Sequence, residues 1–104
     1  MQIKKINIRM DSDILCFLRE QIKLSNYSKR RFIQDILTSY VAEIENTSTK
    51  NITTYVGYKK SAYYVLDVTD VLKNKLDKLA NRYDISISEL IRCAFINWYV
   101  DING

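Results

Sequence analysis

Polar and apolar residues alternate in a short segment near the start of each half of the chain. In Lys5–Met10 every second residue is apolar, which is typical of a strand with one buried face. Tyr63–Val68 is rich in aromatic and β-branched residues and predicts a second strand, although its outward positions are less polar. Apolar residues three and four positions apart follow each segment and predict amphipathic helices that end near Leu24 and Arg82.

Side chains that cap helices mark the predicted boundaries. Acidic and hydroxyl side chains at the start of a helix accept hydrogen bonds from its free N–H groups, and Asn or Asp tolerates the left-handed conformation that often ends one. A second, strongly apolar helix then begins in each half, with an apolar face wide enough to require burial. The boundary residues are Asp11–Asp13, Thr69, Asp70, Asn26, Asp84, Ser28 and Ser86, with Glu89 completing a capping box.

The two halves align with each other without a gap. At an offset of 58 residues Ile6 meets Tyr64, and Ser28 meets Ser86. One constant offset satisfies a strand, two helices and the turn between them, so we interpret the chain as a tandem repeat.

The repeat predicts how the chain is organised. Residues 1–45 form the first unit, 46–61 a linker and 62–104 the second unit. The polar part of the linker, 46–51, predicts a loop, whereas Ile52–Tyr58 is expected to form a strand of its own or to lie on the sheet. Each unit is too small to be stable alone and leaves both edges of its strand open. We therefore predict a mainly α fold in which the two strands pair as an antiparallel ribbon, giving an intramolecular pseudo-dimer.

Composition narrows the function. The chain has 104 residues, 16 Lys and Arg, 12 Asp and Glu, no His and a net charge of +4. Without an imidazole there is no base for Ser-His-Asp or Cys-His catalysis, and two Cys do not supply a structural zinc site. We expect no catalytic residue, cofactor, metal or small-molecule substrate, and so not an enzyme. Cys16 and Cys93 are expected to be small core residues in a reducing cytosol, with a single disulfide as the alternative.

No apolar stretch is long enough to cross a membrane, and the start of the chain is not typical of a secretory signal. These patterns predict a cytoplasmic protein with no membrane partner. The modest basic excess favours a polyanionic partner.

Two longer segments resemble a known family. Val68–Ala80, followed by Ser86–Arg92, is similar to the ribbon-helix-helix (Arc/MetJ-like) superfamily, and Lys5–Met10 resembles its DNA-reading strand. The occurrence of two such units on one chain is similar to the TraY-type proteins. The Asn and Asp at positions 26 and 84 depart from the Gly that the family often has there.

The resemblance implies a sequence-specific double-stranded DNA-binding protein that regulates transcription as a repressor. Its ribbon would enter the major groove, and a pseudo-twofold axis between Asn7 and Val65 would place Lys5 opposite Asp67 and Arg9 opposite Tyr63. Lys5 can then neutralise Asp67, and the bound site would not be palindromic. The expected base-reading residues are Lys5, Asn7, Arg9, Tyr63, Val65 and Asp67; the expected phosphate-binding residues are Ser28, Lys29, Arg30, Arg31, Ser86 and Ser88.

Several alternatives stay open at this point. The chain can serve as a relaxosome-type accessory protein, or as a protein-interaction module, such as an antitoxin or inhibitor, that has lost DNA binding. Two chains can pair through their first strands, or the pseudo-dimer can assemble further on DNA. The polar strand face and Lys29–Arg31 can be ordinary solvated surface. Tyrosines near the linker, Tyr55, Tyr58, Tyr63 and Tyr64, can stack on single-stranded bases.

Overall fold

The computed structural model describes residues 2–46, 59 and 61–104. The elements in chain order are β1 (Ile3–Met10), α1 (Ser12–Ser25), α2 (Lys29–Asn46), β2 (Ala62–Thr69), α3 (Asp70–Arg82) and α4 (Ile87–Asn103). The order strand, helix, helix therefore occurs twice. Most of the predicted linker, including the proposed strand Ile52–Tyr58, lies outside the described residues, as do Tyr55 and Tyr58.

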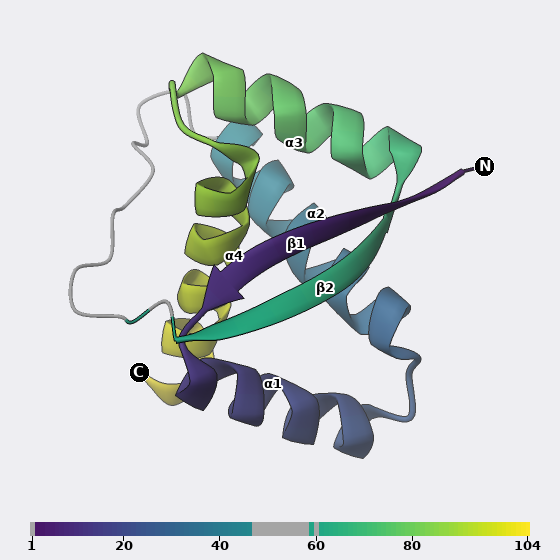
Figure 1. The fold of residues 1–104 in the computed structure, drawn as a ribbon, viewed down its shortest axis with the longest axis vertical. Coiled ribbons are helices and arrows are strands. Elements are labelled where there is room, and N and C mark those ends of the chain that lie inside the picture. Colours follow the sequence, from purple (N-terminus) through teal and green to yellow (C-terminus); the bar gives the residue numbers. More distant parts are fainter. Residues whose placement is uncertain (1, 47–58, 60) are drawn as a thin grey trace.

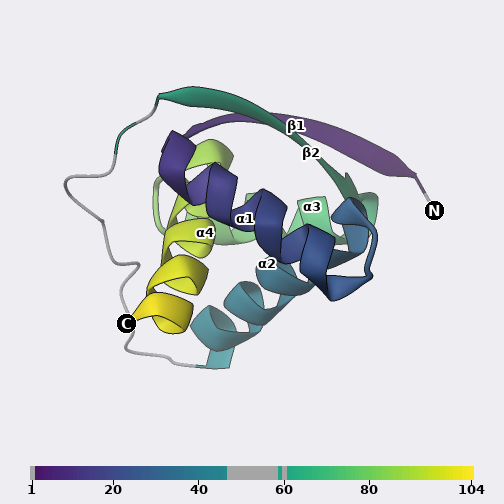
Figure 2. The ribbon, with the colours of Figure 1, turned by 90° about the horizontal axis from the view of Figure 1, so that it is seen from below.

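The two strands form an antiparallel ribbon on one face of the molecule, above the helices (Figures 1 and 2). Helices α2 and α4 lie beneath the ribbon, while α1 and α3 lie on opposite sides of it (Figure 1). The predicted mainly α fold with a short antiparallel ribbon is confirmed.

The strand pairing follows the predicted register. Lys5 lies opposite Asp67, Asn7 opposite Val65, and Arg9 opposite Tyr63. The alternate residues of both strands face the helices and are buried, which explains why the alternation in the sequence locates the strands. These buried strand residues are Ile6, Ile8, Met10, Tyr64, Leu66 and Val68.

The second helices supply most of the remaining core. Ile33 and Leu37 of α2 and Leu90 and Phe95 of α4 are fully buried. The ring of Phe95 meets Tyr64 edge-on, with centroids 6.4 Å apart. The apolar faces of α2 and α4 thus close against the ribbon, as their wide apolar stripes predict.

The predicted helix boundaries are confirmed. Asn26 and Asp84 adopt positive φ angles of 64° and 57°, so both occupy the left-handed region after the first helix of each half. The Ser28 hydroxyl accepts a hydrogen bond from the Arg31 N–H at 3.2 Å, and the Ser86 hydroxyl accepts one from the Glu89 N–H at 3.1 Å. Asp11 and Thr69 cap α1 and α3 in the same way.

The prediction for Cys16 was wrong. Cys16 is exposed, because Leu15 and Leu18 occupy the core face of α1 and Cys16 points to the other side. Cys93 is buried as predicted, and both thiols are free, so the alternative disulfide is not formed. Phe32 and Trp98 are only half-buried at the edge of the core.

Candidate nucleic-acid interface

The outward face of the ribbon presents the six predicted base-reading side chains in three cross-strand pairs. Lys5, Asn7 and Arg9 of β1 are exposed, and so are Tyr63 and Val65 of β2. Asp67 is half-buried. The fold therefore brings together all six residues on one accessible surface.

One of these pairs is preorganised by a direct contact. The Arg9 guanidinium carbon lies 4.5 Å from the centroid of the Tyr63 ring, on the adjacent strand. A cation above an aromatic face at this distance is attracted by the ring quadrupole. The contact holds the guanidinium over the ribbon.

The pair at the other end of the ribbon, Lys5 and Asp67, lacks the ion pair by which Lys5 was expected to neutralise Asp67. Lys5 and Asp67 are opposite each other, yet no ion pair joins their side chains in the part of the chain that the structure describes. The Asp67 Oδ1 atom is buried and has no hydrogen-bond partner among those residues. Asp67 therefore presents less of its carboxylate to the outside than strand alternation implies, and the exposed Lys5 forms no ion pair with it among the described residues.

Three consecutive cations mark the start of α2. The Lys29 ammonium donates a hydrogen bond to the Val65 carbonyl at 3.1 Å and lies 4.5 Å from the Tyr64 ring centroid. Arg31 stacks on Tyr27 at 4.3 Å. Lys29 thus ties the helix start to the back of β2.

Arg30 lies nearby in a shallow hollow of about 270 Å³. Ser28 and Arg31 line this hollow as well, together with Ile3 and Thr69 from the ends of the two strands. The free N–H groups and positive dipole end at the start of α2 favour an anion here together with Arg30 and Arg31, and Asp35, which also lines the hollow, opposes it.

The corresponding start of α4 carries less positive charge. The Ser86 hydroxyl caps the helix, and Ser88 is half-buried. Arg92 of α4 pairs with Glu89 and donates from Nη1 to the Arg9 carbonyl at 3.4 Å. Of the predicted phosphate-binding residues, those in the first half therefore have more positive charge around them, since Lys29, Arg30 and Arg31 are cations and Ser86 and Ser88 are not.

The structure adds two cations that the sequence reasoning missed. Arg19 and Lys23 of α1 join Lys29 around a hollow of about 440 Å³ beside β2, which Ile22 and residues 63–65 complete. Their spacing of four residues on an amphipathic helix was the available signal, since it puts both on one face. The positions 58 residues later are Asp77, Asn81 and Ile87, none of them cationic.

Burial changes the acid strength of two groups beside this surface. It raises the pKa of the Tyr64 hydroxyl above its ordinary value, although Arg19 acts in the opposite direction. It also raises the pKa of the Cys93 thiol to about 11, with a further contribution from Glu89 and an opposing one from Arg92. Both groups therefore stay protonated at neutral pH.

Among the described residues, no group of three or more Cys, Asp and Glu is placed to hold a metal ion. None of the helices in the same part of the chain is long and apolar enough to cross a membrane.

A comparison with known protein families supports the interpretation of this surface as a nucleic-acid interface. Residues 67–101 match the model of the family described as ribbon-helix-helix protein, copG family. The match covers the end of β2, all of α3 and most of α4, and it supports the ribbon-helix-helix superfamily, whose members generally bind DNA as transcription regulators. No curated protein sequence and no solved structure matches the chain significantly.

Proposed function

We propose that this chain is a sequence-specific double-stranded DNA-binding protein and that it regulates transcription as a repressor. The observation that carries the proposal is the exposed two-stranded ribbon with three cross-strand pairs of outward side chains in register. A two-stranded ribbon fits the major groove of B-DNA, which is about 12 Å wide. The match over residues 67–101 supports the same function.

Base reading falls mainly to β1. Arg9 and Lys5 donate to the O6 and N7 of guanine, and Asn7 pairs with the N6 and N7 of adenine. On β2, Tyr63 and Val65 offer apolar contact to thymine methyl groups, and Asp67 accepts from the N4 of cytosine. Because the two strands differ at every pair, the bound site is not palindromic.

Phosphate contacts come mainly from one side. Arg30 and Arg31, with the capped start of α2, bind one phosphate group, and Lys29, Arg19 and Lys23 line the hollow beside β2. On the other side Ser86 and Ser88 offer only the helix start and their hydroxyls. The protein is therefore held more tightly to one half of its site than to the other.

A single chain supplies both strands. The pairing of β1 with β2 and the repeated order of elements support a tandem repeat that acts as a monomeric pseudo-dimer. We propose a cytoplasmic location for it. Pairing within the chain satisfies one of the two open edges of each strand.

The test is selection of duplexes from a random pool at fixed salt, together with light scattering of the free protein. We expect a non-palindromic consensus bound by a monomer. Arg9→Ala should lose preference at one base pair, by about 1–3 kcal/mol of discrimination. An exposed cation on α3, Lys75→Ala, is the matched control and should select the same consensus. A palindromic consensus, or a pool that shows no enrichment, would refute the proposal.

A further inference from the structure

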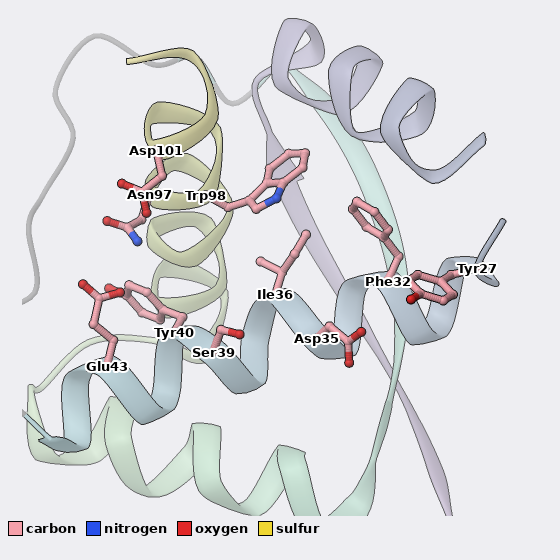
Figure 3. A pocket seen from close by; sticks show the side chains of 10 residues that line it. All are labelled: Tyr27, Phe32, Asp35, Ile36, Ser39, Tyr40, Glu43, Asn97, Trp98 and Asp101. Atoms are coloured by element: carbon pink, nitrogen blue, oxygen red, sulfur yellow. The ribbon is translucent and has the colours of Figure 1, made fainter. Parts of the chain in front are cut away.

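A groove with an aromatic floor lies between α2 and α4, and Figure 3 views it with the two strands behind the helices. Its volume is about 320 Å³. Phe32 and Ile36 of α2 and Trp98 of α4 form the floor, and the rings of Phe32 and Trp98 meet edge-on with centroids 5.9 Å apart. None of the residues that line it belongs to the ribbon, but at one end Asp35 also lines the hollow of Arg30 and Arg31, and Arg31 stacks on the Tyr27 ring.

The charge of this groove is opposite to that of the rest of the protein. Asp35, Glu43 and Asp101 line it, and no Lys or Arg does, although the whole chain has a net charge of +4. Asp35 stands at one end, beside Phe32, whereas Glu43 and Asp101 stand at the other end on two different helices (Figure 3). The occupant that fits is therefore cationic at both ends and apolar in the middle.

The spacing defines the occupant further. Glu43 follows Asp35 by eight residues of α2, which corresponds to a rise of about 12 Å. In an extended peptide, residues two apart point to the same side, and residues four apart are separated by about 13 Å. A segment with basic residues at its first and fifth positions and an apolar residue at the third therefore matches the two acidic ends and the floor between them.

We propose that the groove between α2 and α4 binds an extended segment of a partner protein with the pattern basic–any–apolar–any–basic. Nucleic acid and anionic lipid are disfavoured, because the carboxylates repel phosphate. The apolar side chain packs on Ile36 and Trp98, and one guanidinium gains further attraction from the face of Trp98. This proposal does not depend on the proposed function. The groove lies on the other side of the helices from the two strands, so an occupied groove leaves the ribbon accessible (Figure 3).

Trp98 is the only tryptophan of the chain, so its fluorescence reports occupancy of the groove directly. The probe is a synthetic peptide with the sequence Gly-Ser-Arg-Ser-Leu-Ser-Arg-Ser-Gly, added to the full chain at low salt. A scrambled peptide with adjacent arginines is the first control. We expect a saturable change in emission with the probe and binding at least a few-fold weaker with the scrambled peptide.

Exposed carboxylates are then replaced one at a time. Asp35→Asn and Asp101→Asn should each weaken binding about 1.5- to 5-fold, since exposed ion pairs contribute about 0.2–1 kcal/mol. Glu20→Gln, an exposed acid on α1 that does not line the groove, should leave binding unchanged.

Four results would overturn the proposal. They are no saturable change in Trp98 emission, equal weakening by Glu20→Gln, spermidine saturating the signal at the same concentration as the peptide, and self-association by sedimentation that Asp35→Asn abolishes. The third result would show that the apolar floor has no role, and the fourth would assign the groove to a second copy of this chain. Since DNA binding is measured separately, failure here leaves the proposed function untouched.

Discussion

Removing Arg30 tests whether the start of α2 contacts phosphate. Arg30 is exposed in the hollow that Ser28 and Arg31 also line, and it makes no hydrogen bond or aromatic contact with the residues that the structure describes. Arg30→Ala should therefore leave the fold intact. Any loss of DNA affinity then reports a contact with DNA.

The magnitude follows from counterion release. Each phosphate contact contributes about 0.9 to the slope of log K against log salt concentration, so Arg30→Ala should reduce the slope by about 0.9. Over a fourfold rise in salt the wild-type affinity should consequently fall about 3.5-fold more than that of the variant. The loss should be the same on the selected site and on unrelated duplexes, because phosphates carry no sequence information.

The assay is fluorescence anisotropy with a labelled duplex at several salt concentrations. Lys75→Ala removes an equally exposed cation from α3 and should keep the wild-type slope. Arg9→Ala should instead reduce the ratio of specific to non-specific affinity. The reasoning is refuted if Arg30→Ala keeps the full slope, or if Lys75→Ala lowers it equally.

Four further predictions concern stability and reactivity. Phe95→Ala empties a fully buried position and should lower the free energy of unfolding by about 3–5 kcal/mol, measured by urea denaturation. Asp84→Gly and Asn26→Gly should each raise that free energy by about 0.5–1 kcal/mol, since both positions have positive φ, whereas Asp84→Ala should lower it. Burial raises the pKa of Cys93 from 9.0 to about 11, so its protonated thiol contributes stability that is complete below pH 9 and is lost as the pH rises toward 11. Alkylation followed by mass spectrometry should modify the exposed Cys16 in the native protein and Cys93 only after unfolding.

Local patterns made most of the fold predictable. Alternation locates the strands because one face of the ribbon is buried, and Ser28 and Ser86 locate the helix starts because each caps its own helix. The register of Asn7 against Val65 also followed from the sequence, since an antiparallel pair of equivalent strands is centred on a twofold axis. The prediction that Cys16 is buried was wrong because a neutral, weakly polar residue fits either face of a helix.

Features that depend on how helices pack could not be read from the chain. The bond from Lys29 to the Val65 carbonyl joins residues 36 positions apart, and Arg92 reaches Arg9 over 83 positions. The hollow lined by Arg19 and Lys23 likewise exists only because α1 lies beside β2. Nearest-neighbour patterns contain no information about such distances.

The two halves use different residues for one structural task, and this difference bears on the proposed DNA contact. Lys29 of α2 donates a hydrogen bond to the Val65 carbonyl of β2, while Arg92 of α4 donates one to the Arg9 carbonyl of β1. Arg92 also pairs with Glu89, so its charge is partly neutralised, whereas Lys29 has Arg19 and Lys23 as neighbours. Two identical chains would have to carry the same residues at both positions and would bind both halves of a site equally. A single chain that contains both strands is free of that restriction, and Arg19, Lys23 and Lys29 surround one hollow between α1 and β2 that has no cationic counterpart at the positions 58 residues later. A protein built this way should bind its site in one orientation, set by phosphate contacts before any base is read.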